Sequence, residues 1–220
     1  TIELFSSLLH RRFCAPGRAF SETTVYPEGT LSPENMASKL SVSTISVSAA
    51  DYGCDVDMYS SNVYVENLNT GTVVLAKNID EQVPPASLTK IMTYIVVTEN
   101  VPDLENTYVT VTSASLANLD PASSVMGLSG FVGSEFSVLE LLYGLMLPSG
   151  NDAALVLANF VGDGSVDNFV EMMNRKAGQL GCKSTHFVNP HGLTADDHYT
   201  TVYDLYLIFN KVIEYELFRE

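Results

Sequence analysis

The sequence predicts an α/β fold of the α+β type, with an antiparallel sheet and a cluster of helices. Residues 62–78 alternate between apolar and polar side chains on both sides of a tight turn, which is typical of a β-hairpin. Residues 86–220 carry several apolar repeats at helical spacing. A two-stranded hairpin is not stable alone in water, and no clear partner strands follow residue 187. The sheet is therefore expected to be incomplete in this chain.

The bulk composition is that of a globular protein. The chain has 220 residues, enough for one sizeable domain with a hydrophobic core or for two small ones. Hydrophobic residues make up 46% and charged residues 17%. The formal net charge of -15 argues against nucleic acid and anionic membrane surfaces as partners. No long apolar run is present, so no transmembrane segment is expected.

The composition changes near residue 58. Residues 1–57 predict a poorly structured leader or linker, because prolines and glycines are followed there by a Ser/Thr/Ala-rich run. Residues 39–51 have the positive residue and small-residue ending of a signal-peptide cleavage region. Their middle is too polar for the apolar segment of such a signal, so no clear signal peptide is identified. Residues 58–220 are expected to form the folded domain.

The first elements of this domain follow from alternation and turn signals. The runs "NVYVENL" and "TVVLAKN" flank the turn "NTG" and predict the hairpin. A helix is expected to begin near Ala86 or Ser87, directly after two prolines. The alternation of residues 107–112 predicts a short strand.

Further helices follow from capping signals. Ser137 begins an S-x-x-E capping box, which predicts a helix start. The next helix is expected to be capped by Asn151 or Asp152. A third occupies "SVDNFVEMMNRKAGQLG", with its final glycine as the stop. A last helix is expected to start at about Thr201 and to continue to the end of the chain.

The three cysteines, Cys14, Cys54 and Cys182, are far apart in the sequence. No CxxC pair or His cluster accompanies them, which argues against a zinc site, and no metal is expected. Their odd number argues against a disulfide framework. One bridge with a free thiol, or three buried thiols, are the alternatives.

Ser87 and Lys90 form an S-x-x-K pair and share one face of a predicted helix. A serine hydroxyl is a weak nucleophile until a base removes its proton, and lysine is that base only where its ammonium form is disfavoured. A dry pocket has this effect, since fully buried lysines reach a pKa of roughly 5–6. The spacing is short and common, however. By itself it favours a lysine whose amine extends along its own stem to the surface.

A second polar group lies in "PSGNDAA", between two predicted helices. Ser149 and Asn151 flank Gly150 there, and such a turn presents a hydroxyl and a carboxamide at one fixed place. Taken alone, ordinary turn and capping chemistry is the preferred explanation. His191 and His198 have no acid or serine partner nearby in the sequence, so both are interpreted as structural.

The two motifs together are specific. S-x-x-K, S-D-N and K-T-G are the motif set of class A β-lactamases and penicillin-binding proteins. The sequence resembles the serine D-alanyl-D-alanine carboxypeptidases of the penicillin-binding-protein family over residues 62–218, which implies a β-lactamase/transpeptidase-like fold. S-G-N in place of S-D-N favours the carboxypeptidase branch. The resemblance rests on "PPASLTKIMT", "LLYGLMLPSGNDAALVLA", "FVEMMNRKAGQLG", "THFVNPHGL" and "HYTTVYDL".

The resemblance implies a role for each motif residue. Ser87 is expected to be the acylated nucleophile and Lys90 its general base. Ser149 is expected to relay a proton to the leaving D-alanine, and Asn151, with Gly150 beside it, to bind the substrate amide and hold the Lys90 side chain. The implied substrate is the D-Ala-D-Ala end of a peptidoglycan stem peptide outside the cytoplasm. β-Lactams, which mimic that dipeptide, are the expected inhibitors, and no cofactor is implied.

The third motif, K-T-G or K-S-G, is absent, because the lysines after Ser149 occur in "KAG", "KST" and "KVI". In the family this motif lies on a strand that binds the substrate carboxylate and helps to form the oxyanion hole, and losing such contacts costs several kcal/mol. The chain is therefore expected to be a C-terminally truncated fragment and a poor catalyst. Two alternatives remain: a β-lactamase-like hydrolase, and a non-catalytic relative that binds peptidoglycan or a partner protein.

Overall fold

The computed structural model describes residues 59–120 and 122–220, and the predicted leader and its boundary lie outside these ranges. The chain divides into two units, Thr1–Asn78 and Ile79–Glu220. Within the described ranges, none of the helices has both the length and the apolar character needed to cross a membrane.

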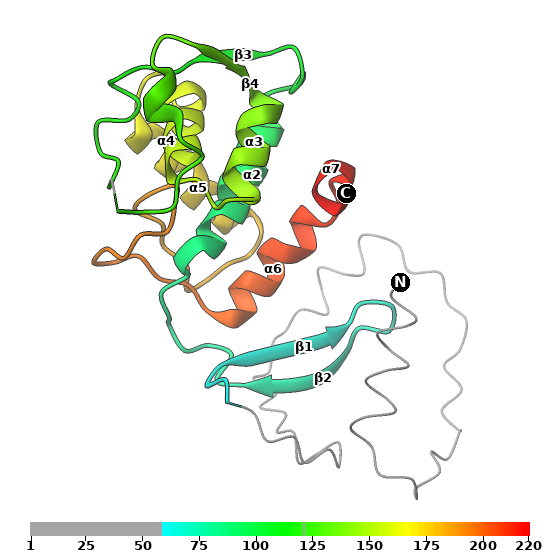
Figure 1. Ribbon diagram of the computed structural model, residues 1–220. Helices are drawn as coiled ribbons and strands as arrows, with labels where there is room; N and C mark the ends of the chain where they lie inside the picture. The colour runs from blue at the N-terminus through cyan, green and yellow to red at the C-terminus, as the bar shows by residue number, and fades with distance from the viewer. Residues whose placement is uncertain (1–58, 121) are drawn as a thin grey trace, which may run out of the picture. The chain divides into compact units, whose positions relative to one another are not determined.

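The described part of the first unit is the predicted β-hairpin (Figure 1). Strands β1 (Val63–Asn67) and β2 (Thr72–Lys77) pair antiparallel with one bulge. In the turn, the carbonyl of Asn67 accepts a hydrogen bond from the N–H of Gly71 at 2.8 Å. Gly71 has a φ of 65°, which glycine adopts without strain. The predicted hairpin is confirmed.

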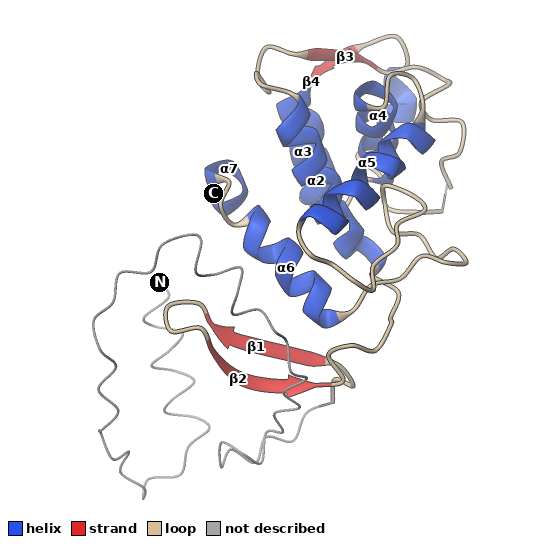
Figure 2. Ribbon diagram, turned by 180° about the vertical axis from the view of Figure 1, so that it is seen from behind, coloured by secondary structure: helices blue, strands red, loops and turns tan. Residues whose placement is uncertain are grey.

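The second unit is a cluster of helices with a small antiparallel sheet at one end (Figure 2). This architecture confirms the predicted α+β class, and each sheet in the described ranges has two strands. In chain order, its elements are η3 (Ala86–Leu88), α2 (Thr89–Asn100), β3 (Tyr108–Thr110), η4 (Leu128–Phe131), β4 (Glu135–Ser137), α3 (Val138–Met146), α4 (Asn151–Val161), α5 (Val166–Gln179), α6 (Val202–Val212) and α7 (Glu216–Arg219).

Helix α2 is the centre of this cluster and contacts α3, α4, α5 and α6. All residues of its segment Thr89–Val97 are buried. A helix that is surrounded in this way must satisfy its own polar side chains inside the protein, because an unpaired buried polar group costs free energy. Thr89, Lys90 and Thr93 find internal partners, described below, whereas the Tyr94 hydroxyl is the exception and is buried without a hydrogen-bond partner among the described residues.

The strand predicted at residues 107–112 is confirmed as β3, but its partner β4 was not predicted. The pairing joins two segments that are distant in the sequence, so only the tertiary structure reveals it. Strand β4 leads directly into α3 through the predicted capping box. The Ser137 hydroxyl accepts from the N–H of Glu140 at 3.2 Å, and the Glu140 carboxylate accepts from the N–H of Ser137 at 2.8 Å.

The caps of α5 and α6 also agree with the predictions. The Ser165 side chain caps α5, and Gly181 follows that helix with a φ of 87°. The Thr201 hydroxyl caps α6 by accepting from the N–H of Asp204 at 3.1 Å. These are local signals, which explains why the sequence predicts them well.

The predicted last helix is divided in two, so the expectation that it continues to the end of the chain was wrong. Helix α6 ends at Val212 and α7 begins at Glu216. Between them Tyr215 has an extended backbone, and its ring packs edge-on against Tyr94 with 6.2 Å between ring centroids. Packing against α2 therefore redirects the chain, and no local sequence signal reports this.

Candidate active site

Ser87 lies in η3, directly before α2, and its side chain is exposed. The predicted helix start near Ala86 or Ser87 is confirmed. Ala86 has a φ of 48°, which is strained for a residue with a Cβ. The turn at Gly192 packs directly on it, since a Cβ at Gly192 would lie 1.8 Å from the Ala86 carbonyl oxygen. This close backbone contact holds the segment that presents Ser87.

The amine of Lys90 does not reach the surface. Lys90 is 2% exposed, and its Nζ donates to the backbone carbonyl of His191 at 2.7 Å. Burial lowers the pKa of Lys90 from 10.5 to about 8 by removing water from the ammonium group. A lysine with this pKa is partly neutral near physiological pH and can accept a proton. The geometry is thus that of a candidate base and not of a surface lysine.

The segment after α5 binds three polar side chains of α2, those of Thr89, Lys90 and Thr93. Besides the bond from Lys90, the Thr93 hydroxyl donates to the carbonyl of Pro190 at 2.6 Å, and Thr89 Oγ1 lies 2.9 Å from His198 Nε2. The N–H of Val188 donates to His198 Nδ1 at 3.0 Å, so we assign the ring proton to Nε2, which then donates to Thr89. The turn "NPHGL" is therefore fixed on α2 at the candidate base.

Sequence reasoning missed this use of the segment. His191 and His198 were interpreted as structural, and the interpretation of their side chains agrees with the contacts observed. The contribution of His191 to Lys90 is made by its main-chain oxygen, which has no side-chain signature. The available signal was that Thr89, Lys90 and Thr93 interrupt the mainly apolar run of residues 89–97, which requires buried partners from another segment.

Both histidines are held in the neutral form. The pKa of His191 falls from 6.5 to about 4, first because of burial and then because of the nearby charges of Lys90 and His198. Burial also lowers the pKa of His198, with a smaller contribution from the charge of His186. Neutral imidazoles beside Lys90 add no positive charge at neutral pH.

Ser149 lies in the turn between α3 and α4 in a strained conformation. Its φ is 57°, in the left-handed region. Its Oγ is buried and has no hydrogen-bond partner, which is unusual for a buried hydroxyl. The turn thus holds a strained residue with a free buried hydroxyl, and both features are typical of functional positions.

Gly150 is not the left-handed residue of its turn: its φ is -64°, whereas that of Ser149 is 57°. The glycine is required for a different reason. A Cβ at Gly150 would lie 2.6 Å from the Gly144 carbonyl oxygen, to which the N–H of Gly150 donates at 3.0 Å. Close backbone approach, and not backbone conformation, excludes a side chain here.

Asn151 is the first residue of α4 and is 4% exposed. The expectation that Asn151 or Asp152 caps this helix was wrong: the N-cap is Gly150, and no side chain caps the helix. The N–H of Asn151 donates instead to the carbonyl of Ser124 at 2.9 Å. The buried Asp152 carboxylate accepts from the loop that follows Ser124 and from the N–H of Ala153.

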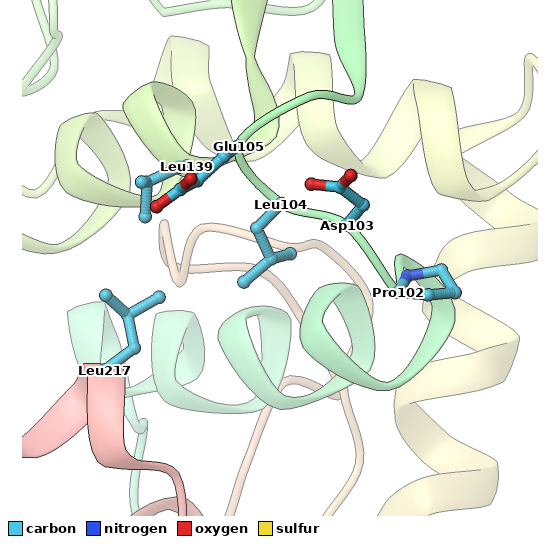
Figure 3. A pocket seen from close by; sticks show the side chains of 6 residues that line it. All are labelled: Pro102, Asp103, Leu104, Glu105, Leu139 and Leu217. Carbon is cyan, nitrogen blue, oxygen red and sulfur yellow. The ribbon is translucent and has the colours of Figure 1, made fainter.

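The motif residues lie on two helices in mutual contact: Ser87 and Lys90 at the start of α2, and Ser149 and Asn151 at the start of α4. Within the described ranges no hydrogen bond joins these four side chains to one another. A groove elsewhere in the unit, shown in Figure 3, contains none of them. Its lining residues are Pro102, Asp103, Leu104, Glu105, Leu139 and Leu217.

The fold and the two motifs define a class of protein. A helical cluster with S-x-x-K at the start of its central helix and S-G-N in the turn before a neighbouring helix is the arrangement of the penicillin-recognising serine enzymes. The chain belongs to the D-alanyl-D-alanine carboxypeptidase family, peptidase S11, whose sequence profile matches residues 47–219.

Individual relatives agree with this assignment. The D-alanyl-D-alanine carboxypeptidase DacF of Bacillus subtilis is 39% identical over 158 residues, which cover 71% of this chain and 39% of that protein. Penicillin binding protein 5 of Haemophilus influenzae has a TM-score of 0.66 and 33% identity, covering 72% of this chain and 46% of that one. The Streptomyces K15 DD-transpeptidase has a TM-score of 0.66 and 35% identity, covering 74% and 65%. These likenesses confirm the predicted transpeptidase-like fold, while the chain spans less than half the length of DacF.

Proposed function

We propose that the complete protein containing this chain is a serine D-alanyl-D-alanine carboxypeptidase that binds penicillin and acts on peptidoglycan stem peptides outside the cytoplasm. The main support from the structure is Lys90. Its buried amine, with a pKa of about 8, lies three residues after the exposed hydroxyl of Ser87, on the same helical segment. Family membership supports the reaction type and the substrate class.

In the acylation step, Ser87 Oγ attacks the carbonyl carbon of the penultimate D-alanine while neutral Lys90 takes the serine proton. The bond from Nζ to the His191 carbonyl uses one N–H of the amine and leaves its lone pair available. Collapse of the tetrahedral intermediate breaks the peptide bond and forms an ester on Ser87. Water then attacks this ester and releases the shortened peptide.

The leaving D-alanine needs a proton on its nitrogen, and we assign its delivery to Ser149. A hydroxyl can accept a proton on one side and donate one on the other, and Ser149 Oγ is not engaged by any described group. Asn151 is assigned to the substrate amide, because its carboxamide can both donate and accept. Gly150 contributes by allowing the close turn that places these two side chains.

The test is covalent labelling by fluorescent penicillin of the complete gene product that contains these residues. Ser87→Ala should abolish the adduct, seen by gel fluorescence and intact mass, and should leave the unfolding temperature unchanged because the side chain is exposed. Ser113→Ala removes another exposed hydroxyl and should label like wild type. Labelling of Ser87→Ala at the wild-type level would remove Ser87 as the nucleophile.

The lifetime of the adduct and further assays of the same protein separate the alternative functions. A long-lived penicilloyl adduct supports the carboxypeptidase, whereas rapid turnover of nitrocefin favours a β-lactamase-like hydrolase. Absence of any adduct, together with binding of peptidoglycan, favours a non-catalytic relative. Release of D-alanine from a stem-peptide mimic by the wild-type protein establishes the proposed reaction itself.

A further inference from the structure

Asp152, which follows Asn151 in α4, is the most extensively bonded buried carboxylate of the described residues. It is fully buried, with an exposed fraction of 0%. Its two oxygens accept four backbone N–H bonds: from Met126 and Ala153 to Oδ1 at 2.8 and 2.9 Å, and from Gly127 and Leu128 to Oδ2 at 2.8 Å each. Three of these donors belong to a loop that lies 24 to 26 residues earlier in the chain.

Only a group with two accepting oxygens fits this set of donors. A carboxylate offers two acceptors, whereas a carboxamide replaces one of them with an N–H2 donor. In Asp152→Asn, that donor would face at least one of the loop N–H groups, and a buried N–H would lose its partner. The site therefore discriminates strongly between two side chains of almost the same shape.

The loop held by Asp152 is in contact with the turn that carries the second motif. The carbonyl of Ser124 accepts from the N–H of Asn151 at 2.9 Å. A Cβ at Gly150 would lie 3.1 Å from the backbone nitrogen of Met126 and 3.0 Å from Asp152 Oδ1. Asp152 thus holds the loop in place, directly against Gly150 and Asn151.

The turn needs this support from the loop because the backbone of Ser149 is strained. Its left-handed backbone is strained and persists only where surrounding contacts enforce it. Its buried hydroxyl also forms no hydrogen bond with the described residues that would offset this strain. Without the loop, the turn is free to relax, and Ser149 and Asn151 move together with it.

We infer that Asp152 is a positioning residue for the reaction: its carboxylate fixes the loop at residues 124–128 and thereby holds Ser149 and Asn151 in their working geometry. This inference rests on the proposed function. It requires no contact between Asp152 and the substrate. A displacement of about 1 Å in such a group can slow a reaction about 100-fold, which sets the scale of the expected effect.

The experiment compares Asp152→Asn with wild type in the complete gene product, using stopped-flow acylation by fluorescent penicillin well below both unfolding temperatures. The saturation curve separates the dissociation constant of the first complex from the maximal acylation rate. We expect the maximal rate to fall about 10- to 100-fold, while the dissociation constant changes far less. Asp204→Asn is the matched control, because Asp204, on α6, is also a buried carboxylate. It accepts from the N–H of Ser184 at 2.8 Å and from the Thr185 hydroxyl at 2.7 Å.

Failure of this inference and failure of the proposed function give different results. If Asp152 only stabilises the fold, both variants lower the unfolding temperature and both acylate like wild type, which overturns the inference. If wild type itself forms no adduct on Ser87, the proposed function fails instead. Hydrogen exchange of the wild-type protein covers the case in which Asp152→Asn does not fold. The amides of residues 126–128 should be strongly protected, and free exchange there would also overturn the inference.

Discussion

At the residue scale, the central feature is a lysine that is kept from water. Burial lowers the pKa of an amine, so a larger fraction of it is neutral at neutral pH and able to accept a proton than for an amine in water. Lys90 reaches this state by burial: its amine donates to the neutral His191 carbonyl, and no carboxylate among the described residues forms an ion pair with it that would stabilise the charged form. The exposed Ser87 hydroxyl nearby then has a base suited to neutral pH.

This predicts the pH dependence of acylation. Because the neutral amine is the active form and its pKa is about 8, the acylation rate should rise as pH increases from 6.5 to about 8 and should level off above it. Lys90→Ala should slow acylation by about 10²–10⁴-fold and remove this rise. The measurement is the rate of penicillin labelling between pH 6 and 9.5.

The matched control is Lys183→Ala, which removes an exposed lysine amine elsewhere in the unit. It should retain both the rate and the profile of wild type. A wild-type rate that does not change across this range of pH would show that Lys90 is not the base.

At the element scale, the turn between α3 and α4 depends on close backbone contact. Gly150 has an ordinary φ of -64°, so backbone strain does not explain the glycine. The limit is the Gly144 carbonyl oxygen, which belongs to the helix backbone and cannot rotate away as a side chain could. The turn and α3 therefore form one packed element.

Gly150→Ala should destabilise the protein by about 1–3 kcal/mol, because the new Cβ overpacks against that carbonyl. Gly178→Ala is the control on α5, where a Cβ meets nothing within 4 Å and removes backbone freedom from the unfolded chain. It should stabilise by about 0.5–1 kcal/mol. Urea unfolding measures both, and equal effects of the two substitutions would contradict the packing argument.

At the scale of the whole molecule, the segment from His186 to Thr200 joins distant parts of the second unit. It binds the side chains of Thr89, Lys90 and Thr93 in α2, and Thr200 forms a two-way backbone bridge with Val83, with bonds of 2.8 and 2.9 Å. Its two buried histidines are neutral in the folded protein. Protonating them places a charge in a buried site beside Lys90, so acid is expected to destabilise this part of the fold.

The sign of the effect follows from proton uptake. The unfolded chain binds a proton at His191 below pH 6.5, whereas the folded protein does so only below about pH 4. Stability should therefore be unaffected by this group above pH 6.5 and should fall as pH decreases toward 4. The loss from His191 alone is on the order of 3 kcal/mol when complete. Urea unfolding at pH 7, 6, 5 and 4.5 measures it.

Substituted proteins identify the group responsible. His191→Asn retains an acceptor near the N–H of Leu193, which donates to His191 Nδ1 at 3.2 Å, and should flatten the decline in stability. His186→Gln changes a histidine that is 39% exposed and should leave the decline as it is in wild type. A decline of the wild-type size in His191→Asn would assign acid sensitivity to other groups.

Much of the fold could be predicted from local sequence patterns. The hairpin, the capping box at Ser137 and the cap at Thr201 were predicted because each is specified by residues within a few positions of one another. Strand β4 and the break between α6 and α7 were missed. Both depend on partners distant in sequence: β3 for the first, and the Tyr94 ring for the second.

The sequence alone determined the chemistry available to this protein, because S-x-x-K and S-G-N name the hydroxyls, the amine and the carboxamide. Only the tertiary structure decided the state of those groups. Lys90 is a buried base and not a surface cation because the folded protein removes water from its amine, whose hydrogen-bond partner, His191, is 101 residues away. The strained backbone of Ser149 lies against a loop held by Asp152. Charge state and strain are set by the surrounding atoms, and these come from segments that no local pattern connects.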